Sequence, residues 1–290
     1  MIKYAFFIGC AGPVFARHYE LSARKVARLF GIELVDVEEF ACCGFPVRSF
    51  DEKMSLLLAA RDLAIAEDKG LDICTICSGC TAMLTEVSHK LQSQDMMREE
   101  ANTHLREIGR TFKGTTEVKH FARVLYDDIG IDGIKNKVTQ SLQHLTIASH
   151  YGCHYLKPSS VFEKFEDPEF PRTLDSLVSA TGAKIVDYEE KTMCCGGNIL
   201  DVNEKISLTM AGTKLNHIKE AAPDAINLVC PLCSVMYDRN QRIIERTMQR
   251  SYNLPVLFYP QLLGLAMGLK PSELGLDLNR VRTAELVAKL

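Results

Sequence analysis

The cysteines of this 290-residue chain follow one pattern, and the pattern occurs twice. A single cysteine comes first, an adjacent pair follows, and a C-x-x-C closes the set. The single cysteine and the pair are separated by 31 residues (11 to 41) in the first copy and by 40 (154 to 193) in the second; the pair and the C-x-x-C are separated by 33 (44 to 76) and 34 (196 to 229). Because random placement does not give this order twice, the chain contains a duplicated unit. The first cysteine set is Cys10, Cys42, Cys43, Cys77 and Cys80, and the second cysteine set is Cys153, Cys194, Cys195, Cys230 and Cys233.

The residues between the cysteines repeat as well. "GIELVDVEEFACCG" (31–44) aligns with "GAKIVDYEEKTMCCGG" (182–197), sharing Gly, Val-Asp, Glu-Glu and Cys-Cys-Gly. The extra length of the second copy fits a proline-bounded polar segment at 158–171, which we interpret as an insertion loop. We therefore predict two domains, an N-terminal one at 1–145 that includes a helical connector and a C-terminal one at 146–290.

Each half alternates short apolar runs with longer amphipathic stretches. Strands are expected at 4–9, 32–37 and 71–76 in the first half and at 145–152, 183–188 and 225–229 in the second, with helices between them. This alternation predicts an α/β fold of two similar domains, each with a small parallel sheet flanked by helices, related by a pseudo-twofold axis. The cysteines follow the strands, and the carboxyl ends of parallel strands share one edge, so each half should bring five thiols together there.

Other segments carry expectations that bear less directly on the site. Cys74 lies outside the repeated pattern and is expected to be a small buried residue of a strand. Residues 84–145 are expected to be mostly helical and charged, with a turn-rich connector at 130–137. The helices at 84–110 suit a partner contact as well as a solvated surface, and the apolar run 255–278 is expected to belong to the core.

Five cysteines with two of them adjacent narrow the chemistry of each set. A C-x-x-C suits zinc, a redox dithiol or an iron–sulfur cluster. Zinc takes four ligands and a thiol-exchange site uses two, so both leave thiols unused. Adjacent side chains of an extended backbone point to opposite faces, and the glycines after each pair allow both thiols to turn toward one site. A polynuclear iron–sulfur centre is the interpretation that uses all five.

Several stretches around the cysteines point to a known family. "YAFFIGC" (4–10), "HYGCHYLKP" (150–158), "CPLC" (230–233) and "PVLFYPQLLGLAMGLKPSELGLDL" (255–278) accompany the duplicated pattern. Together they resemble the catalytic B subunit of heterodisulfide reductase, which consists of two cysteine-rich "CCG" domains. The resemblance extends over nearly the whole chain.

The resemblance implies a cofactor and a reaction. Each complete cysteine set would hold one noncubane [4Fe-4S] cluster, and a disulfide such as that of coenzyme M and coenzyme B would be cleaved between the two clusters in one-electron steps. The electron source would be the ferredoxin-like C subunit of heterodisulfide reductase, fed by its flavin-containing A subunit or by a membrane cytochrome. His154 is a candidate proton donor because it adjoins Cys153, although it also suits a hydrogen bond to backbone or to a cluster sulfur. Lys157 and Arg48 are candidates for attracting an anionic substrate.

Composition excludes several other classes of function. The formal net charge of −3 gives no basic field for nucleic acid or an anionic membrane. The apolar runs are too short for a signal sequence or a membrane span, so we expect a cytoplasmic protein without membrane insertion. A flavin or dinucleotide fingerprint and a P-loop are absent from the sequence, so electrons must come from another protein.

Three alternatives stay open on the sequence alone. In the first, the chain acts on another sulfur compound, or in the reverse direction, in sulfur-oxidising or sulfate-reducing metabolism. In the second, it is a non-catalytic subunit that relays electrons between partners. In the third, it is a structural protein stabilised by zinc.

Overall fold

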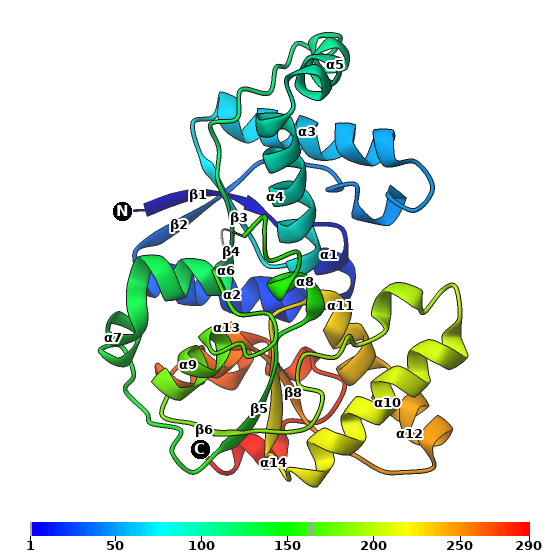
Figure 1. The fold of residues 1–290 in the computed structure, drawn as a ribbon. Helices are drawn as coiled ribbons and strands as arrows, with labels where there is room; N and C mark the ends of the chain where they lie inside the picture. Colours follow the sequence, from blue (N-terminus) through cyan, green and yellow to red (C-terminus); the bar gives the residue numbers. More distant parts are fainter. Residues whose placement is uncertain (1, 163–164) are drawn as a thin grey trace.

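The computed structural model describes residues 2–162 and 165–290 and contains two four-stranded sheets (Figure 1). Every strand pairing is parallel, and the strand order is equivalent in the two sheets, β2-β1-β3-β4 and β6-β5-β7-β8. The predicted α/β architecture with two similar parallel sheets is therefore confirmed. The strands are β1 Ile2–Phe7, β2 Ile32–Asp36, β3 Asp72–Thr75, β4 Val118–His120, β5 Thr146–His150, β6 Lys184–Val186, β7 Ala225–Leu228 and β8 Val256–Phe258.

Helices connect the strands, because parallel neighbours require a crossover between them. Those of the first half are α1 Ala11–Phe15, α2 Arg17–Leu29, α3 Glu52–Asp68, α4 Ser78–Ser93, α5 Asp95–Arg106, α6 Phe121–Arg123 and α7 Gly130–Lys135. Those of the second half are α8 Cys153–Leu156, α9 Thr173–Ala180, α10 Glu204–Glu220, α11 Pro231–Ser234, α12 Gln241–Met248, α13 Tyr259–Ala266 and α14 Ala284–Val287. Short 3-10 helices are η1 Phe45–Val47, η3 Gly197–Ile199, η5 Pro271–Leu274 and η6 Leu276–Leu278, and π-helical turns are η2 Val124–Ile129 and η4 Val235–Arg239.

The segment between the two sheets differs from its prediction in two places. Residues 118–120 form the edge strand β4, within a segment that was expected to be mostly helical. The predicted turn at 130–137 is wrong for its first six residues, which form α7 because Ile134 is fully buried and the helix packs against α9. The predicted insertion loop at 158–171 includes residues 163 and 164, which lie outside the described residues; the described part of the loop contains neither helix nor strand.

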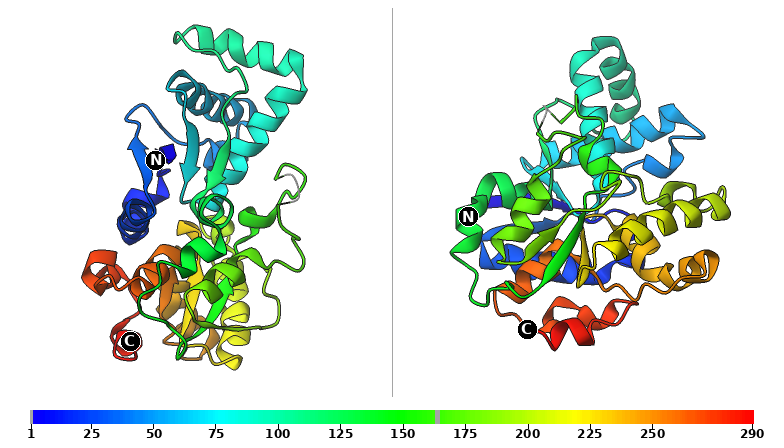
Figure 2. Two further views of the ribbon diagram at one scale, coloured as in Figure 1. Left: turned by 90° about the vertical axis from the view of Figure 1, so that its left-hand side faces the viewer. Right: turned by 60° about the horizontal axis from the view of Figure 1, so that its bottom comes forward.

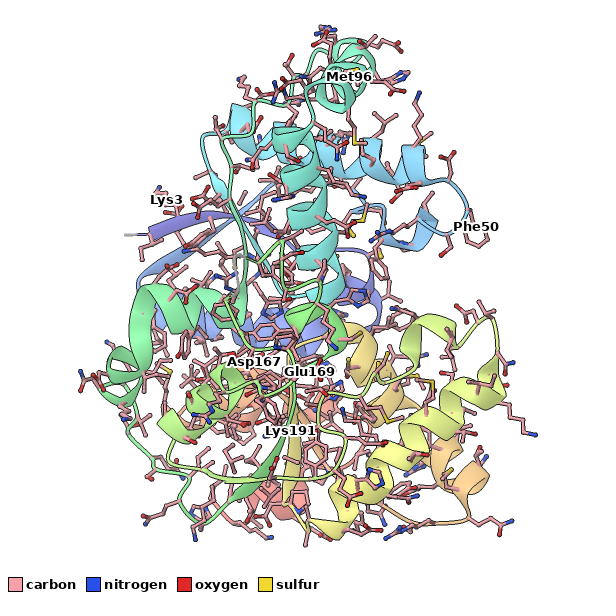
Figure 3. The ribbon with its side chains drawn as sticks, viewed as in Figure 1. Lys3, Phe50, Met96, Asp167, Glu169 and Lys191 are labelled. Carbon is pink, nitrogen blue, oxygen red and sulfur yellow. The ribbon has the colours of Figure 1, made fainter. Side chains whose placement is uncertain are left out.

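The apolar run at 255–278 is largely core, as expected. It forms β8 and α13, and every residue of α13 is buried. Cys74 is also fully buried, on β3. Side chains that stay exposed are at the periphery: Phe50, 90% exposed, precedes α3 and Met96, 89% exposed, is on α5 (Figure 3). In the part of the chain that the structure describes, none of the helices combines the length and the apolar character that crossing a membrane requires.

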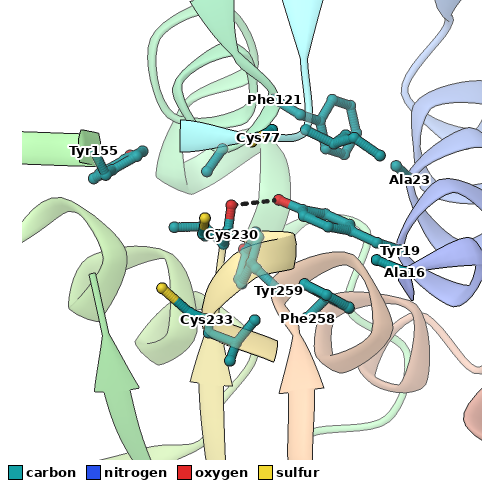
Figure 4. Packing of buried hydrophobic residues seen from close by; sticks show 14 of the residues in the cluster. Ala16, Tyr19, Ala23, Cys77, Phe121, Tyr155, Cys230, Cys233, Phe258 and Tyr259 are labelled. Carbon is teal, nitrogen blue, oxygen red and sulfur yellow. Dashed lines mark hydrogen bonds between the residues drawn. The ribbon is translucent and has the colours of Figure 1, made fainter. Parts of the chain in front are cut away.

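The two halves pack against each other through helices that follow the strands. In the ribbon the first half lies above the second, and the strands β5 and β8 run toward the boundary between them (Figures 1 and 2). Helix α2 packs against α13, α4 against α8, and α1 against α11. Tyr19 of α2 stacks on Phe258 at the end of β8, with ring centroids 4.0 Å apart (Figure 4). The cysteine-bearing edges of both sheets are thereby brought to one boundary.

Candidate metal sites between the two halves

A glycine with positive φ precedes the first cysteine of each set. Gly9 has φ +71°, and a Cβ added there would lie 2.9 Å from the Sγ of Cys80. Gly152 has φ +77°, and its added Cβ would lie 3.6 Å from the Sγ of Cys233. At Gly9 the glycine therefore makes room for the sulfur of the C-x-x-C, whereas at Gly152 the contact is ordinary and the positive φ is the reason for glycine.

A second glycine follows each adjacent cysteine pair and lets the chain turn sharply. Gly44 (φ +86°) and Gly196 (φ +77°) are both left-handed. An added Cβ would lie 2.3 Å from the carbonyl oxygen of Ser55 and 2.9 Å from that of Ser207, respectively. The glycine thus packs the cysteine-pair loop directly onto the backbone of the following helix, α3 or α10. The backbone freedom expected of these glycines is therefore present, and the turning of both thiols toward one site stays a prediction.

The first cysteine set becomes more buried from Cys10 toward the C-x-x-C. Cys10 is exposed, Cys42 is half-buried, and Cys43, Cys77 and Cys80 are buried. The Sγ atoms of Cys43 and Cys80 are 3.4 Å apart. Hydrogen bonds from the thiols of Cys42 and then Cys80 lower the pKa of Cys43 to about 4, so this sulfur ionises readily. The set therefore reaches from the solvent at Cys10 to the interior of the molecule.

The second cysteine set is arranged in a similar way and has backbone donors. The Sγ of Cys153 lies 3.8 Å from that of Cys194, and the sulfurs of Cys195 and Cys233 are 3.5 Å apart. The backbone amides of Gly196 and Gly197 donate to the sulfurs of Cys194 and Cys195 at 3.4 Å each. Hydrogen bonding from Cys153 and then Cys195 lowers the pKa of Cys194. The thiolate form that binds metal is therefore favoured at Cys194, whereas the same pairing raises the pKa of Cys195 to about 12.

The two cysteine sets meet at the boundary between the halves. Cys77 and Cys230, the first cysteines of the two C-x-x-C motifs, are neighbours across it: Ser78, which follows Cys77, contacts the carbonyl of Val229, which precedes Cys230, and Cys230 is the largest cause of the raised pKa of Cys77. The carbonyl of Val229, just before Cys230, accepts three contacts from the first half. They come from Tyr19 Oη at 3.3 Å (Figure 4), Ser78 Oγ at 3.5 Å and His120 Nε2 at 2.9 Å. The position of Cys230 thus depends on both halves.

The donors present suit an iron–sulfur cluster. Soft thiolate ligands select iron–sulfur clusters, zinc or copper(I), and each set supplies five of them. Amides aimed at the sulfurs are the type of contact that stabilises such a centre. Glycine occurs where the backbone approaches the sulfur. Both sets fit the group that the sequence predicts.

A histidine that the sequence pattern did not single out also contacts the second cysteine set. His150, at the end of β5, is buried, and its Nε2 lies 3.2 Å from the Sγ of Cys233. Burial lowers the pKa of His150 well below its ordinary value, so the ring is neutral. Ligand atoms of His150, Cys195 and Cys233 lie within 4.8 Å of one another, an arrangement that also suits a single metal ion. The sequence could have singled out this histidine, because "HYGC" in the second half matches "FIGC" in the first, where Phe7 takes the place of His150.

A pocket of about 370 Å³ opens beside Cys153 and His154. His154 Nδ1 lies 3.3 Å from the Sγ of Cys153, and its ring packs edge-on against Phe45 of the first half, with centroids 4.7 Å apart. The pocket therefore lies between the halves and combines an apolar wall with an ionisable group next to a cysteine. It is lined by Phe45, Arg48, Ala82, Met83, Glu86, Cys153, His154, Lys157 and Pro158.

The two cations expected to attract an anion both have carboxylate partners. Arg48 makes two hydrogen bonds of 2.8 Å with Glu86, and Lys157 lies 3.0 Å from Glu169. Each lines the pocket, but its charge is partly neutralised. The pocket is consequently less positive than the sequence suggested.

Comparison with known proteins supports the duplicated domain. The sequence matches the cysteine-rich domain family, CCG, over residues 4–85 and 147–238. It is 38% identical to the B subunit of the ferredoxin/F(420)H(2)-dependent CoB-CoM heterodisulfide reductase of Methanosarcina acetivorans, with 100% of this chain and 97% of that protein aligned. It is 31% identical to the "8-methylmenaquinol:fumarate reductase membrane anchor subunit" of Wolinella succinogenes, with 98% of this chain and 99% of that protein aligned.

A solved structure shares the fold. The crystal structure of a hypothetical protein from Helicobacter pylori matches with a TM-score of 0.78 at 16% identity. The match covers 97% of this chain and 52% of that chain. At this identity the likeness concerns the fold alone.

Proposed function

Because this chain belongs to the CCG cysteine-rich domain family and, within it, to the relatives of the heterodisulfide reductase B subunit, we propose that it is the disulfide-reducing subunit of a heterodisulfide-reductase-like complex. The family places the chain among oxidoreductases that act on sulfur groups. The observation that carries the proposal is the meeting of the two C-x-x-C motifs at one boundary, where Ser78 contacts the carbonyl of Val229, near a pocket lined by His154. A site shared by two equivalent units suits a substrate with two sulfur atoms.

Each cysteine set is proposed to hold one noncubane [4Fe-4S] cluster. When bound, such a group supplies electrons one at a time, whereas a disulfide requires two, so two sites serve one substrate. The ligands of the first would be Cys10, Cys42, Cys43, Cys77 and Cys80. Those of the second would be Cys153, Cys194, Cys195, Cys230 and Cys233.

The reaction consumes two electrons and two protons for each disulfide that is cleaved into two thiols. The chain's own contribution to proton supply is assigned to His154. Its Nδ1 contacts the Sγ of Cys153, and its ring lines the pocket, so a substrate sulfur held there is within reach of the same imidazole. The neighbouring Phe45 ring fixes the imidazole orientation and excludes water from one side.

The pocket lining indicates a small substrate with an apolar portion. Phe45, Ala82 and Met83 can contact methylene groups of a substrate. Arg48 can bind an anionic end of the substrate, although its guanidinium is also hydrogen-bonded to Glu86. The heterodisulfide named for the Methanosarcina relative is the substrate we propose. Proposed partners are the ferredoxin-like C subunit of such a complex and its flavin-containing A subunit or an equivalent donor.

Metal and sulfide analysis of anaerobically purified protein tests the proposal first. About four iron and four sulfide for each half are expected. The decisive second measurement is an EPR titration of the oxidised protein with a thiol, which should produce a new paramagnetic signal. Zinc without iron would contradict the proposal and favour the three-ligand arrangement around His150.

The relative from Wolinella supports a second candidate function. Its name concerns menaquinol and fumarate rather than a disulfide, although 98% of this chain aligns with it. A subunit that relays electrons within a complex is the corresponding function for this chain. Iron and sulfide in the expected amounts, without any thiol-induced EPR signal, would favour the relay over the reductase.

A further inference from the structure

Helices α3 and α10 occupy equivalent positions behind the two cysteine-pair loops, and they correspond residue by residue. Asp51 caps α3 and Asn203 caps α10, each accepting from the amide three residues on. Ser55 and Ser207 then contact a methionine sulfur at 3.9 Å in both halves. Without a gap in either helix, this register places Asp62 and Lys214 at equivalent positions.

Lys214 is a fully buried cation directly behind the second cysteine pair. Its Nζ donates to the carbonyl of Lys191 and to that of Met193, at 2.7 Å each, and Met193 precedes Cys194. Among residues 2–162 and 165–290, none of the carboxylates forms an ion pair with it. Burial lowers the pKa of Lys214 to about 8, against the opposing effect of the thiolates of the second cysteine set, so the ammonium is charged at pH 7.

Asp62 is a fully buried acid in the same place behind the first cysteine pair. Its Oδ1 accepts from the amide of Ala41 at 3.2 Å and pairs with Arg61 at 2.8 Å. The guanidinium of Arg61 is 31% exposed, so water screens its charge. Burial raises the pKa of Asp62 to about 7. The loop of the first set is therefore held by a carboxyl, whereas the loop of the second is held by an ammonium.

The strands β5 and β1, which precede the first cysteine of each set, show a second difference between the two sites. His150, three residues before Cys153, places a ring nitrogen 3.2 Å from the sulfur of Cys233. Its Nδ1 has no hydrogen-bond partner among the described residues, so Nε2 is the ring atom placed to hydrogen-bond this sulfur. Phe7, three residues before Cys10, has no polar atom to offer and packs against Phe40. In the described part of the chain, only the second site combines a buried positive charge with a ring nitrogen at hydrogen-bonding distance from a ligand sulfur.

We propose that Lys214 and His150 make the two cysteine sites electrostatically unequal, so that the second site has the less negative reduction potential and accepts an electron first. A nearby positive charge and a hydrogen bond to a ligand sulfur both stabilise the more negative, reduced state. Lys214 and His150 are positioning and tuning residues rather than catalytic ones. This inference rests on the proposed function, because it requires a redox centre at both cysteine sets.

Redox titration of the anaerobic protein, followed by EPR, tests the inference. The wild type should show two separate potentials. Lys214→Met should lower the higher potential and leave the other unchanged. We expect the equilibrium constant for one-electron reduction to fall about tenfold, which is about 59 mV for a one-electron couple. His150→Phe, which copies the first half, should lower the same potential.

Two variants serve as controls. Lys205→Met removes the same charge from an exposed position at the start of α10 and should leave both potentials unchanged. Asp62→Asn changes the equivalent position of the other half and should leave the higher potential unchanged. If Asp62→Asn moves the potential that Lys214→Met moves, the assignment to the second site is wrong.

Failure of the inference and failure of the proposed function give different results. Wild-type protein without iron and sulfide would contradict the proposed function itself. Protein with full iron content whose potentials do not respond to Lys214→Met would overturn only the inequality of the sites. If Lys214→Met releases the cysteine-pair loop and loses iron, His150→Phe decides: an unchanged higher potential in that variant overturns the inference, and a lowered one supports it.

Discussion

Gly9 and Gly31 have almost the same backbone dihedral, with φ +71° and +70°, but different surroundings. A Cβ at Gly9 would lie 2.9 Å from the Sγ of Cys80, whereas a Cβ at Gly31 would meet nothing within 4 Å. The two positions therefore require glycine for different reasons. Gly31 is required by its backbone conformation alone, whereas Gly9 is also required by the space that the Cys80 sulfur occupies.

Gly9→Ala should displace the Cys80 sulfur and reduce the iron content to about half, because one of two sites is affected. Gly31→Ala should cost about 1 kcal/mol of unfolding free energy through its left-handed backbone and leave the iron content unchanged. Iron analysis and urea denaturation of both variants provide the measurements. Equal iron contents in the two variants would show that the sulfur does not need the space at Gly9.

The sequence predicted the cysteines of the candidate site better than their surroundings. Cysteine spacing is visible in one dimension, and the duplication makes it specific. His150 and Lys214 escaped prediction because a histidine in a strand and a lysine in a helix are ordinary residues until the packing is known. Comparing the two halves residue by residue would have revealed both, since the repeat has Phe7 and Asp62 at those positions.

At the level of elements, the first turn of α3 and of α10 stabilises the end of each cysteine-pair loop. The side chain of Asp51 accepts from the amide of Met54 at 2.9 Å, and that of Asn203 accepts from the amide of Ile206 at 3.1 Å. These caps satisfy amides that have no partner within the helix. They also fix the point at which each loop becomes a helix.

Replacing either cap by alanine should destabilise the protein by about 1 kcal/mol. Asp51→Ala and Asn203→Ala should give similar losses, because the two helices are equivalent. Lys205→Ala, in the exposed first turn of α10, is the control and should have little effect. Urea midpoints followed by circular dichroism measure the losses; a midpoint for Asp51→Ala equal to that of the control would refute the capping role.

Elements with a clear apolar or amphipathic pattern were predicted, including the edge strands β2 and β6, whereas the edge strands β4 and β8 and helix α7 were not. Strand β4 has only three residues, two of them polar or charged, so its pairing with β3 comes from tertiary structure. Strand β8 lies at the start of the apolar run at 255–278, where no change of pattern separates it from the helix that follows. Helix α7 was obscured by its two glycines, because burial of Ile134 outweighs their low helix propensity.

At the level of the whole molecule, His18 makes the contact between the halves sensitive to acid. It lies on α2, is 4% exposed, and packs against Phe258 with ring centroids 5.0 Å apart. Burial lowers the pKa of His18 to about 4, while Asp277 acts in the opposite direction. The unfolded chain thus binds a proton more tightly than the folded one between pH 6.5 and 4, and stability falls as pH falls through that range.

His18→Leu should remove this part of the pH dependence. Between about pH 7.5 and 5.5 the wild type should lose about 1.3 kcal/mol more unfolding free energy than the variant, as expected for one histidine with these pKa values. Urea denaturation at the two pH values gives the difference. His144→Leu, which replaces an exposed histidine, should behave as the wild type does; equal pH dependence of all three proteins would show that His18 is not the group responsible.

The three contacts on the carbonyl of Val229 exist on one side of the molecule only. Ser78 corresponds to Pro231 in the other half, and His120, the last residue of β4, corresponds to Phe258, the last residue of β8. Neither proline nor phenylalanine has a side-chain donor, so the second half cannot return these two contacts to the carbonyl of Ile76, which corresponds to that of Val229. A symmetric homodimer of the second half would therefore lack both donors in both copies. The first half of this chain cannot be replaced by a duplicate of the second without losing these contacts.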